Sequence, residues 1–193
     1  MTGKAIFAIV LAAGSSTRFG RTKQLVPIDG TPLATVAVRK TESVCGARTV
    51  LVTGKEWQEV ADACKPLAGF FVINDDYENG IASSIACGVR AIAASADAVL
   101  LMMADLPLVT AEHLASLVEA WRNSPQSIVA SAFEDTLGPP VVFPRRDFDA
   151  LLKLTGDHGA RPVIDANAGR VLSIVCEEAA FDIDRPEDLA GIY

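Results

Sequence analysis

Short apolar segments alternate with helical patterns along most of the chain. Several of these segments are almost continuous in Val, Ile and Leu, which is typical of strands that helices cover on both faces. The apolar segments lie at residues 6–11, 50–53, 70–73, 99–103, 128–132, 141–143 and 171–175. The helical patterns lie at residues 32–43, 56–67, 83–94, 111–122 and 147–154. This alternation predicts an α/β fold with one doubly wound, mainly parallel sheet.

Local signals refine the prediction at three places. Thr110 stands before the helical pattern at 111–122 and is a suitable N-cap, and Pro32 suits the first turn of its helix. Residues 133–146 break the alternation and contain the sequence Gly-Pro-Pro at 138–140. Ligands of such sheets bind at the carboxyl ends of the strands. We therefore expect residues 133–146 to form a small inserted hairpin or flap beside the ligand site.

Composition restricts the class of protein. The chain has 193 residues, of which 50% are hydrophobic and 21% charged, which predicts a single compact domain over residues 1–193. The formal net charge of -7 disfavours binding to nucleic acid. The four cysteines lack the spacing of a zinc site and predict reduced thiols in a cytoplasmic protein.

The N-terminal apolar run could be taken for a signal peptide, but it is short and leads directly into a patterned loop. We interpret it as a buried first strand. No apolar stretch is long enough to span a bilayer, so no membrane partner is expected.

The loop after this first strand, residues 11–23, is the strongest candidate for chemistry. It contains small residues, several hydroxyl groups and the cations Arg18, Arg21 and Lys23. Small residues let main-chain amides approach an anion, and the cations can neutralise a triphosphate. The loop fits neither the P-loop nor the dinucleotide-binding pattern. By composition alone, an ordinary surface loop is an equally good interpretation.

The order of residues in the loop resembles the signature of nucleotidyltransferases that make activated sugars and molybdenum cofactors. The sequence Leu-Ala-Ala-Gly at 11–14 is followed by Ser-x-Arg-Phe-Gly at 16–20 and then by Lys23. Residues 25–33, 80–84, 104–107, 155–161 and 181–189 match further blocks, so the resemblance spans nearly the whole chain. The chain is most similar to the molybdenum cofactor cytidylyltransferases of the MobA-like group. That resemblance implies a Rossmann-like nucleotidyltransferase fold.

The resemblance also implies the site. It gives CTP and molybdopterin as substrates, Mg²⁺ or Mn²⁺ as cofactor, and molybdenum hydroxylases or their chaperones as partners. The catalytic residues would be Lys23, Arg18 and Asp105. The nucleotide-binding residues would be Leu11, Ala12, Ala13, Gly14, Ser15, Arg18, Lys23, Ser83 and Ser84. The metal ligands would be Asp105 and Asp184, and the acceptor-binding residues Asp157, His158 and Arg161.

The residues themselves leave alternatives open. Asp105 follows a strand and points to the expected crevice, but a helix or turn cap is also compatible with its position. Asp182 and Asp184 share one face if their segment is extended, so Asp182 could support the metal. Residues 155–161 also suit a helix-capping turn. His113 lies within a helical pattern and is interpreted as an ordinary surface residue.

The function has alternatives as well. The same chemistry could act on a sugar or polyol phosphate. A non-catalytic chaperone for the molybdenum cofactor and a nucleotide-binding regulator are the other possibilities. Intact Lys23, Asp105 and Asp184 favour catalysis, because a metal and a cation stabilise a transferring phosphoryl group.

Overall fold

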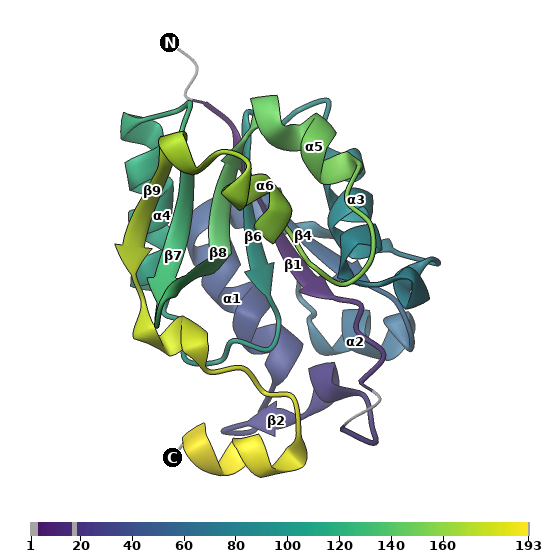
Figure 1. The fold of residues 1–193 in the computed structure, drawn as a ribbon. Coiled ribbons are helices and arrows are strands. Elements are labelled where there is room, and N and C mark those ends of the chain that lie inside the picture. The colour runs from purple at the N-terminus through teal and green to yellow at the C-terminus, as the bar shows by residue number, and fades with distance from the viewer. Residues whose placement is uncertain (1–3, 17–18, 193) are drawn as a thin grey trace.

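A seven-stranded sheet forms the centre of the molecule (Figure 1). The computed structural model describes residues 4–16 and 19–192. The strands follow the order β5-β4-β1-β6-β8-β7-β9. They are β1 (Ile6–Ala12), β4 (Thr49–Thr53), β5 (Phe70–Ile73), β6 (Ala98–Met103), β7 (Ile128–Phe133), β8 (Thr136–Pro144) and β9 (Val171–Val175). A separate two-stranded sheet pairs β2 (Pro27–Ile28) with β3 (Thr31–Pro32).

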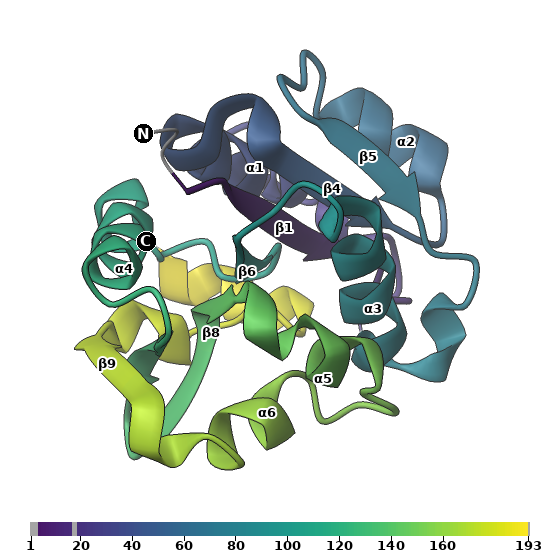
Figure 2. The same cartoon turned by 90° about the horizontal axis from the view of Figure 1, so that it is seen from above.

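Helices cover both faces of the large sheet (Figure 2). They are α1 (Leu33–Cys45), α2 (Trp57–Ala63), α3 (Ile81–Ile92), α4 (Ala111–Asn123), α5 (Phe148–Leu152) and α6 (Arg161–Asp165). One face packs against α1, α2 and α4, and the other against α3, α5 and α6. The predicted doubly wound α/β fold is confirmed. The short helix α6 was not predicted, and only its first residue, Arg161, belongs to the block assigned to the acceptor.

The alternation of side chains along β1 explains why the strand reads as a continuous apolar run. Ala8 and Val10 face the core under α1 and α4, whereas Ile9 and Leu11 face the core under α3. All four are buried, Leu11 with 7% of its surface exposed. Each fully buried aliphatic side chain stabilises the fold by about 1.5–3 kcal/mol before the cost of ordering the chain.

Residues 133–146 contain the turn and the second strand of a hairpin formed by β7 and β8, and this hairpin is part of the main sheet rather than an insertion. β8 runs antiparallel to both of its neighbours, β6 and β7, while the other pairings in the large sheet are parallel. The turn between β7 and β8 therefore lies at the edge where β1 and β6 end. This places the start of β8, rather than a detached flap, at the edge where ligands of such sheets bind.

Two local predictions can also be compared with the structure. The Thr110 hydroxyl accepts a hydrogen bond from the His113 N–H at 3.1 Å and caps α4, as predicted. Pro32 is the N-cap residue of α1 and pairs in β3, one position before the first turn.

All four cysteines are unpaired thiols. Within the described residues, no helix has the length and apolar character needed to cross a membrane.

Candidate active site

Two hollows meet at the carboxyl ends of β1 and β6. The strand order reverses between these strands, and Leu11 and Met103 are register partners at their ends. Leu11, Met103 and Asp105 line both hollows. A reversal of strand order of this kind opens a crevice for ligands in α/β sheets. The hollow on the side of residues 13–15 is called the loop-side hollow, and the one beside β8 the hairpin-side hollow.

The loop-side hollow has a volume of about 430 Å³. Ala13, Gly14, Ser15 and Lys23 of the predicted nucleotide loop line it, together with Ser84 of α3. The Ala12 side chain instead faces the core under α1, so only its main chain is directed toward this edge. Arg18, which the sequence also assigned to this site, lies outside the described residues.

Gln24 anchors the loop, and the sequence analysis did not identify it. Its side chain is 4% exposed, and its Nε2 donates a hydrogen bond to the Gly14 carbonyl at 2.9 Å. Its Oε1 accepts from the Ser16 hydroxyl at 3.1 Å, and that hydroxyl accepts from the Lys23 N–H at 3.0 Å. These hydrogen bonds fix the position of the Lys23 main chain in the loop. No pattern in the neighbouring sequence indicates this role.

Lys23 reaches across the hollow to two carboxylates. Its Nζ lies 2.7 Å from Asp105 Oδ2 and 3.2 Å from Asp184 Oδ1. The side chains of Lys23 and Asp105 are only 13% and 15% exposed, so water screens this pair weakly. Burial alone would lower the pKa of Lys23, but the attraction of Asp105 and then Asp184 outweighs burial and raises it. Lys23 therefore stays protonated at neutral pH.

Three carboxylates gather at this point. Asp105, Asp182 and Asp184 each offer one oxygen, and these oxygens lie within 4.8 Å of one another. Burial raises the pKa of Asp182, and the nearby charges of Asp105 and Asp184 raise it further, while Lys23 lowers it. The cluster is thus a concentration of negative charge that attracts a cation.

A buried apolar anchor holds two of these carboxylates in place. Ile183 is fully buried in a small core with Phe19, Val26 and Leu33, and its N–H donates to the Asp105 carbonyl at 3.0 Å. Asp182 and Asp184 flank it, so both carboxylates are directed to the site while Ile183 points to this core. The predicted alternation along residues 182–184 therefore occurs, although the segment is not part of a strand.

Asp188 supports the same segment. Its Oδ2 accepts hydrogen bonds from the N–H groups of Asp184 and Arg185, at 2.8 and 2.7 Å. A carboxylate that accepts two main-chain N–H groups is typical of a cap, and it fixes the main chain at Asp184.

The donor set fits a hard divalent cation. Mg²⁺ and Mn²⁺ prefer carboxylate oxygens and water, and three carboxylate oxygens at this spacing provide such ligands. The Lys23 ammonium group between Asp105 and Asp184 indicates that the place already favours positive charge. The residues present are therefore compatible with the metal that the sequence implies.

The start of α3 closes the loop-side hollow. Asn74 is buried and donates to the hydroxyl groups of Ser83 and Ser84, at 2.8 and 2.9 Å. The Ser83 hydroxyl group lies 2.9 Å from the Asp76 carbonyl and 2.8 Å from the Gly80 carbonyl, and its single hydrogen can be donated to either of them. Ser84 lines the hollow, whereas the hydroxyl group of Ser83 is engaged in holding the turn. The two hydroxyl groups thus contribute in different ways to this wall.

Asp157 lies where the two hollows adjoin. Asp157 lines both, and its Oδ1 accepts from the Ile81 N–H at 3.3 Å, so it caps the start of α3. Gly80 has φ +92, and a Cβ there would lie 2.4 Å from Asp157 Oδ1. Only glycine fits this turn without strain. Asp157 thus supports the start of α3 from a distant part of the chain and is also part of the site.

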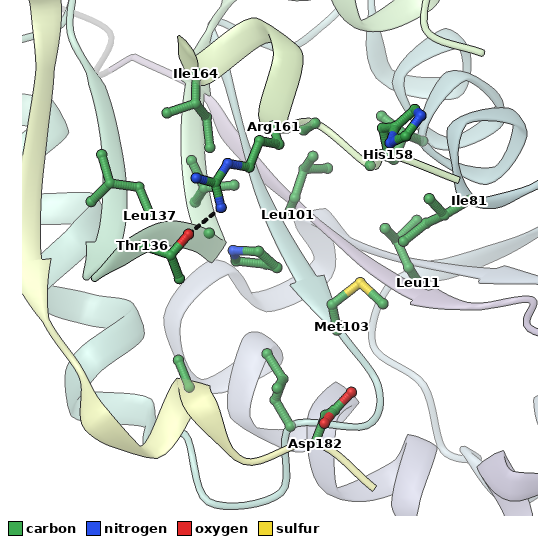
Figure 3. A pocket seen from close by; sticks show the side chains of 18 of the residues that line it. Leu11, Ile81, Leu101, Met103, Thr136, Leu137, His158, Arg161, Ile164 and Asp182 are labelled. Atoms are coloured by element: carbon green, nitrogen blue, oxygen red, sulfur yellow. Dashed lines mark hydrogen bonds between the residues drawn. The ribbon is translucent and has the colours of Figure 1, made fainter. Parts of the chain in front are cut away.

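The hairpin-side hollow is larger in apolar surface and has a volume of about 440 Å³. Its walls include Leu101, Phe133, Leu137, Pro139 and Ile164. Figure 3 shows several of these side chains around the opening, with Asp182 at one end and His158 at another. This hollow can hold a flat, partly apolar molecule next to the carboxylate cluster.

Arg161 spans part of this opening. Its Nη1 donates to the Thr136 hydroxyl at the start of β8, and its Nε lies 3.7 Å from Asp165 Oδ2 (Figure 3). The Arg161 side chain is 55% exposed and so remains accessible to an anion. His158 also lines the hollow. The three residues predicted to bind the acceptor therefore lie around one hollow, and Thr136 and Phe133 are lining residues that the sequence analysis did not assign.

The comparisons with known proteins agree with this geometry. Residues 8–171 match the family described as MobA-like NTP transferase domain. The purine catabolism protein PucB of Bacillus subtilis is 30% identical over 95% of this chain and 93% of its own length. The bifunctional protein GlmU of Rhodopseudomonas palustris is 31% identical over 95% of this chain, which spans 40% of that protein.

A solved structure is similar as well. Rv0371c from Mycobacterium tuberculosis superimposes with a TM-score of 0.86 at 26% identity, over 100% of this chain and 98% of that one. A second structure of that protein, a complex with manganese, gives a TM-score of 0.80 over 98% of both chains, at 23% identity. With the loop, the carboxylate cluster and the fold in agreement, the chain belongs to the MobA-like NTP transferase family and is a nucleotidyltransferase.

Proposed function

We propose that the protein transfers CMP from CTP to molybdopterin, with release of pyrophosphate. The observation that carries the proposal is the meeting of two different hollows at Asp105. The loop-side hollow has Lys23 and the small residues of a phosphate-binding loop, and the hairpin-side hollow is mainly apolar. A triphosphate in the first and a phosphorylated ring system in the second would bring their phosphates together at this carboxylate.

The reaction needs positioning more than a base. An oxygen of the acceptor phosphate forms a bond to the α-phosphorus, and the bond from that phosphorus to the bridging oxygen of pyrophosphate breaks. The nucleophile is already anionic, so no proton has to be removed. Lys23 binds and neutralises the phosphate oxygens, and Gln24 and Ser16 hold the loop in the required shape.

Asp105, Asp182 and Asp184 would hold Mg²⁺ or Mn²⁺. When bound, the ion supplies charge neutralisation at the phosphate oxygens. The carboxylates would hold the ion where the two hollows meet, and Lys23 would exchange its ion pairs with Asp105 and Asp184 for contacts to phosphate oxygens. The manganese complex of Rv0371c, which shares this fold, supports the choice of a hard divalent cation.

The lining of the hairpin-side hollow favours a ring system over a sugar as the acceptor. Phe133, Leu137 and Pro139 have no polar side-chain atoms, and a polyol buried against them would lose hydrogen bonds to water. A flat heterocycle loses less and gains apolar contact. The relative from Bacillus subtilis is named for purine catabolism, which points away from sugar metabolism. Molybdenum hydroxylases or their chaperones would then receive the product.

A comparison of acceptors tests this function. The protein is incubated with CTP, Mg²⁺ and one of three acceptors: molybdopterin, N-acetylglucosamine 1-phosphate or a polyol phosphate. We expect pyrophosphate release with molybdopterin alone, and none with Lys23→Ala. Release only with a sugar or polyol phosphate would move the protein to the alternative acceptor class. Tight binding of molybdopterin with no pyrophosphate from any nucleotide would indicate a chaperone.

A further inference from the structure

One wall of the hairpin-side hollow is formed where the pairing of β7 with β8 is irregular. β7 and β8 are in register at Ala130 and Val141, and again at Ser131 and Gly138. Two consecutive prolines, 139 and 140, therefore have no partner in β7. Proline has no N–H to donate, so a ladder cannot run through this pair. The extra residues bulge out of the ladder, and Pro139 lines the hollow.

A buried polar chain holds the bulge. Ser131 is fully buried, and its hydroxyl group donates to the Pro140 carbonyl at 2.7 Å. The same hydroxyl oxygen lies 2.8 Å from His113 Nε2. A serine hydroxyl has a single hydrogen, and here that hydrogen goes to Pro140. His113 Nε2 must therefore carry a hydrogen and donate it to Ser131.

These hydrogen bonds connect α4, on one face of the sheet, with the wall of the hairpin-side hollow at the edge of the sheet. His113 belongs to the first turn of α4, where the Thr110 cap fixes its main chain. It was interpreted from the sequence as a surface residue, and that interpretation is wrong, because its ring is half-buried and bonded to Ser131. Burial lowers the pKa of His113 and outweighs the opposing effect of Glu178. The lowered pKa favours the neutral ring, which donates to Ser131.

We propose that His113 is a positioning residue for the acceptor, acting through Ser131 and the Pro140 carbonyl on the wall of the hairpin-side hollow. The inference rests on the proposed function in one respect, the assignment of this hollow to the acceptor. His113 would touch no substrate. Its loss would release the bulge at Pro139 and Pro140 and blur the wall formed by Leu137 and Pro139 (Figure 3 shows Leu137 on it).

The kinetic test separates the two substrates. His113→Ala should raise the KM for molybdopterin about tenfold and leave the KM for CTP within about twofold, since the loop-side hollow is built from other segments. His113→Gln can donate from its own Nε2 and should restore most of the acceptor affinity. Glu119→Gln, an exposed residue of the same helix, serves as the control and should leave both constants unchanged. An equal rise of both KM values in His113→Ala, or no rise in either, would overturn the proposal.

A second measurement does not depend on the identity of the acceptor. Hydrogen exchange of the main chain should become faster over residues 137–142 in His113→Ala and Ser131→Ala, with residues 19–28 unchanged. If wild type fails to use molybdopterin but this pattern appears, the proposed function is wrong and the positioning of the wall by His113 stands. Unchanged exchange at 137–142 would refute the positioning role even if the enzyme transfers CMP as proposed.

Discussion

The main-chain N–H of Ile183 donates a hydrogen bond to the main-chain carbonyl of Asp105 at 3.0 Å. This bond joins the closing segment of the chain to the end of the β6 loop. It sets Asp182 and Asp184 beside Asp105, and all three carboxylates then lie within reach of one ion. The site is therefore assembled from distant parts of the chain, and it depends on a buried isoleucine that lines neither hollow.

The carboxylates lead to the first prediction. Asp105→Asn and Asp184→Asn should each lower kcat about a hundredfold or more, because charge neutralisation at the transferring phosphate is lost. Both variants should remain folded by circular dichroism. Glu187→Gln, an exposed acid in the same segment, is the control and should retain activity. Normal turnover of both Asp variants at saturating Mg²⁺ would refute the metal assignment.

Lys23 and Arg21 give a matched pair of cations. Lys23 is buried against Asp105, whereas Arg21 is exposed and its guanidinium lies 5.9 Å from the centre of the Phe19 ring. Lys23→Ala should lower kcat/KM for CTP by about two orders of magnitude, since a charged contact to the phosphates is lost. Arg21→Ala should lower it by less than about threefold. Steady-state pyrophosphate assays measure both, and equal losses would show that the loop binds phosphate differently.

The opening of the hairpin-side hollow provides a third prediction. If Arg161 binds the acceptor phosphate, Arg161→Ala should raise the KM for molybdopterin about tenfold or more, as expected for a lost charge-assisted hydrogen bond. Thr136→Val removes one of the two partners of Arg161 and leaves Asp165, so it should leave this KM nearly unchanged or lower it. An unchanged KM in Arg161→Ala would leave Arg161 with a purely structural role.

The stability of the protein should depend on pH through His113. Its pKa is below the ordinary value because burial disfavours the charged ring. The unfolded chain takes up the proton first as the pH falls below about 6.5, so stability present above that pH is lost on acidification through the folded pKa. His113→Gln lacks this contribution. The melting temperature of wild type relative to His113→Gln should therefore decrease between about pH 8 and about pH 5.

The sequence was sufficient for the fold because its strands are covered on both faces. β1 and β6 are nearly continuous apolar runs, and the helices between strands carry clear periodicity and, at Thr110, a working cap. The loop at 11–23 and Asp105 could be assigned to one site because parallel strands end at one edge, whereas the metal role of Asp184 came from the family resemblance. Their meeting is now seen in the ion pairs of Lys23.

The remaining parts of the site depend on contacts that no local pattern encodes. Gln24 and Asp188 are polar residues whose partners are main-chain groups, and nothing in their neighbours along the chain signals this. His113 was misinterpreted because helical periodicity does not reveal which side chain of a neighbouring strand contacts a partly buried helical residue. Asp157 was assigned to the acceptor from the sequence. Its hydrogen bond to the start of α3 was not predicted, because it depends on the positive φ of Gly80, which brings two distant segments into contact.

Base choice tests the central claim most directly. Ala13 is 4% exposed and lines the loop-side hollow together with Tyr77. Packing beside Tyr77 is tight, since a Cβ on Gly54 would lie only 2.8 Å from the Tyr77 side chain. If the base packs on this turn, as we propose, the methyl group of Ala13 takes space that the second ring of a purine would need. Overpacking of this kind costs about 1–3 kcal/mol, or roughly tenfold to a hundredfold in selectivity.

The measurement is kcat/KM for CTP, UTP and GTP with molybdopterin and Mg²⁺, in wild type and in Ala13→Gly, with the nucleotide–pterin product identified by mass. We predict that wild type uses CTP at least about tenfold better than GTP, and that Ala13→Gly narrows this gap. A CTP preference that Ala13→Gly leaves untouched would keep the function and refute the steric explanation. A wild-type preference for GTP would contradict the account.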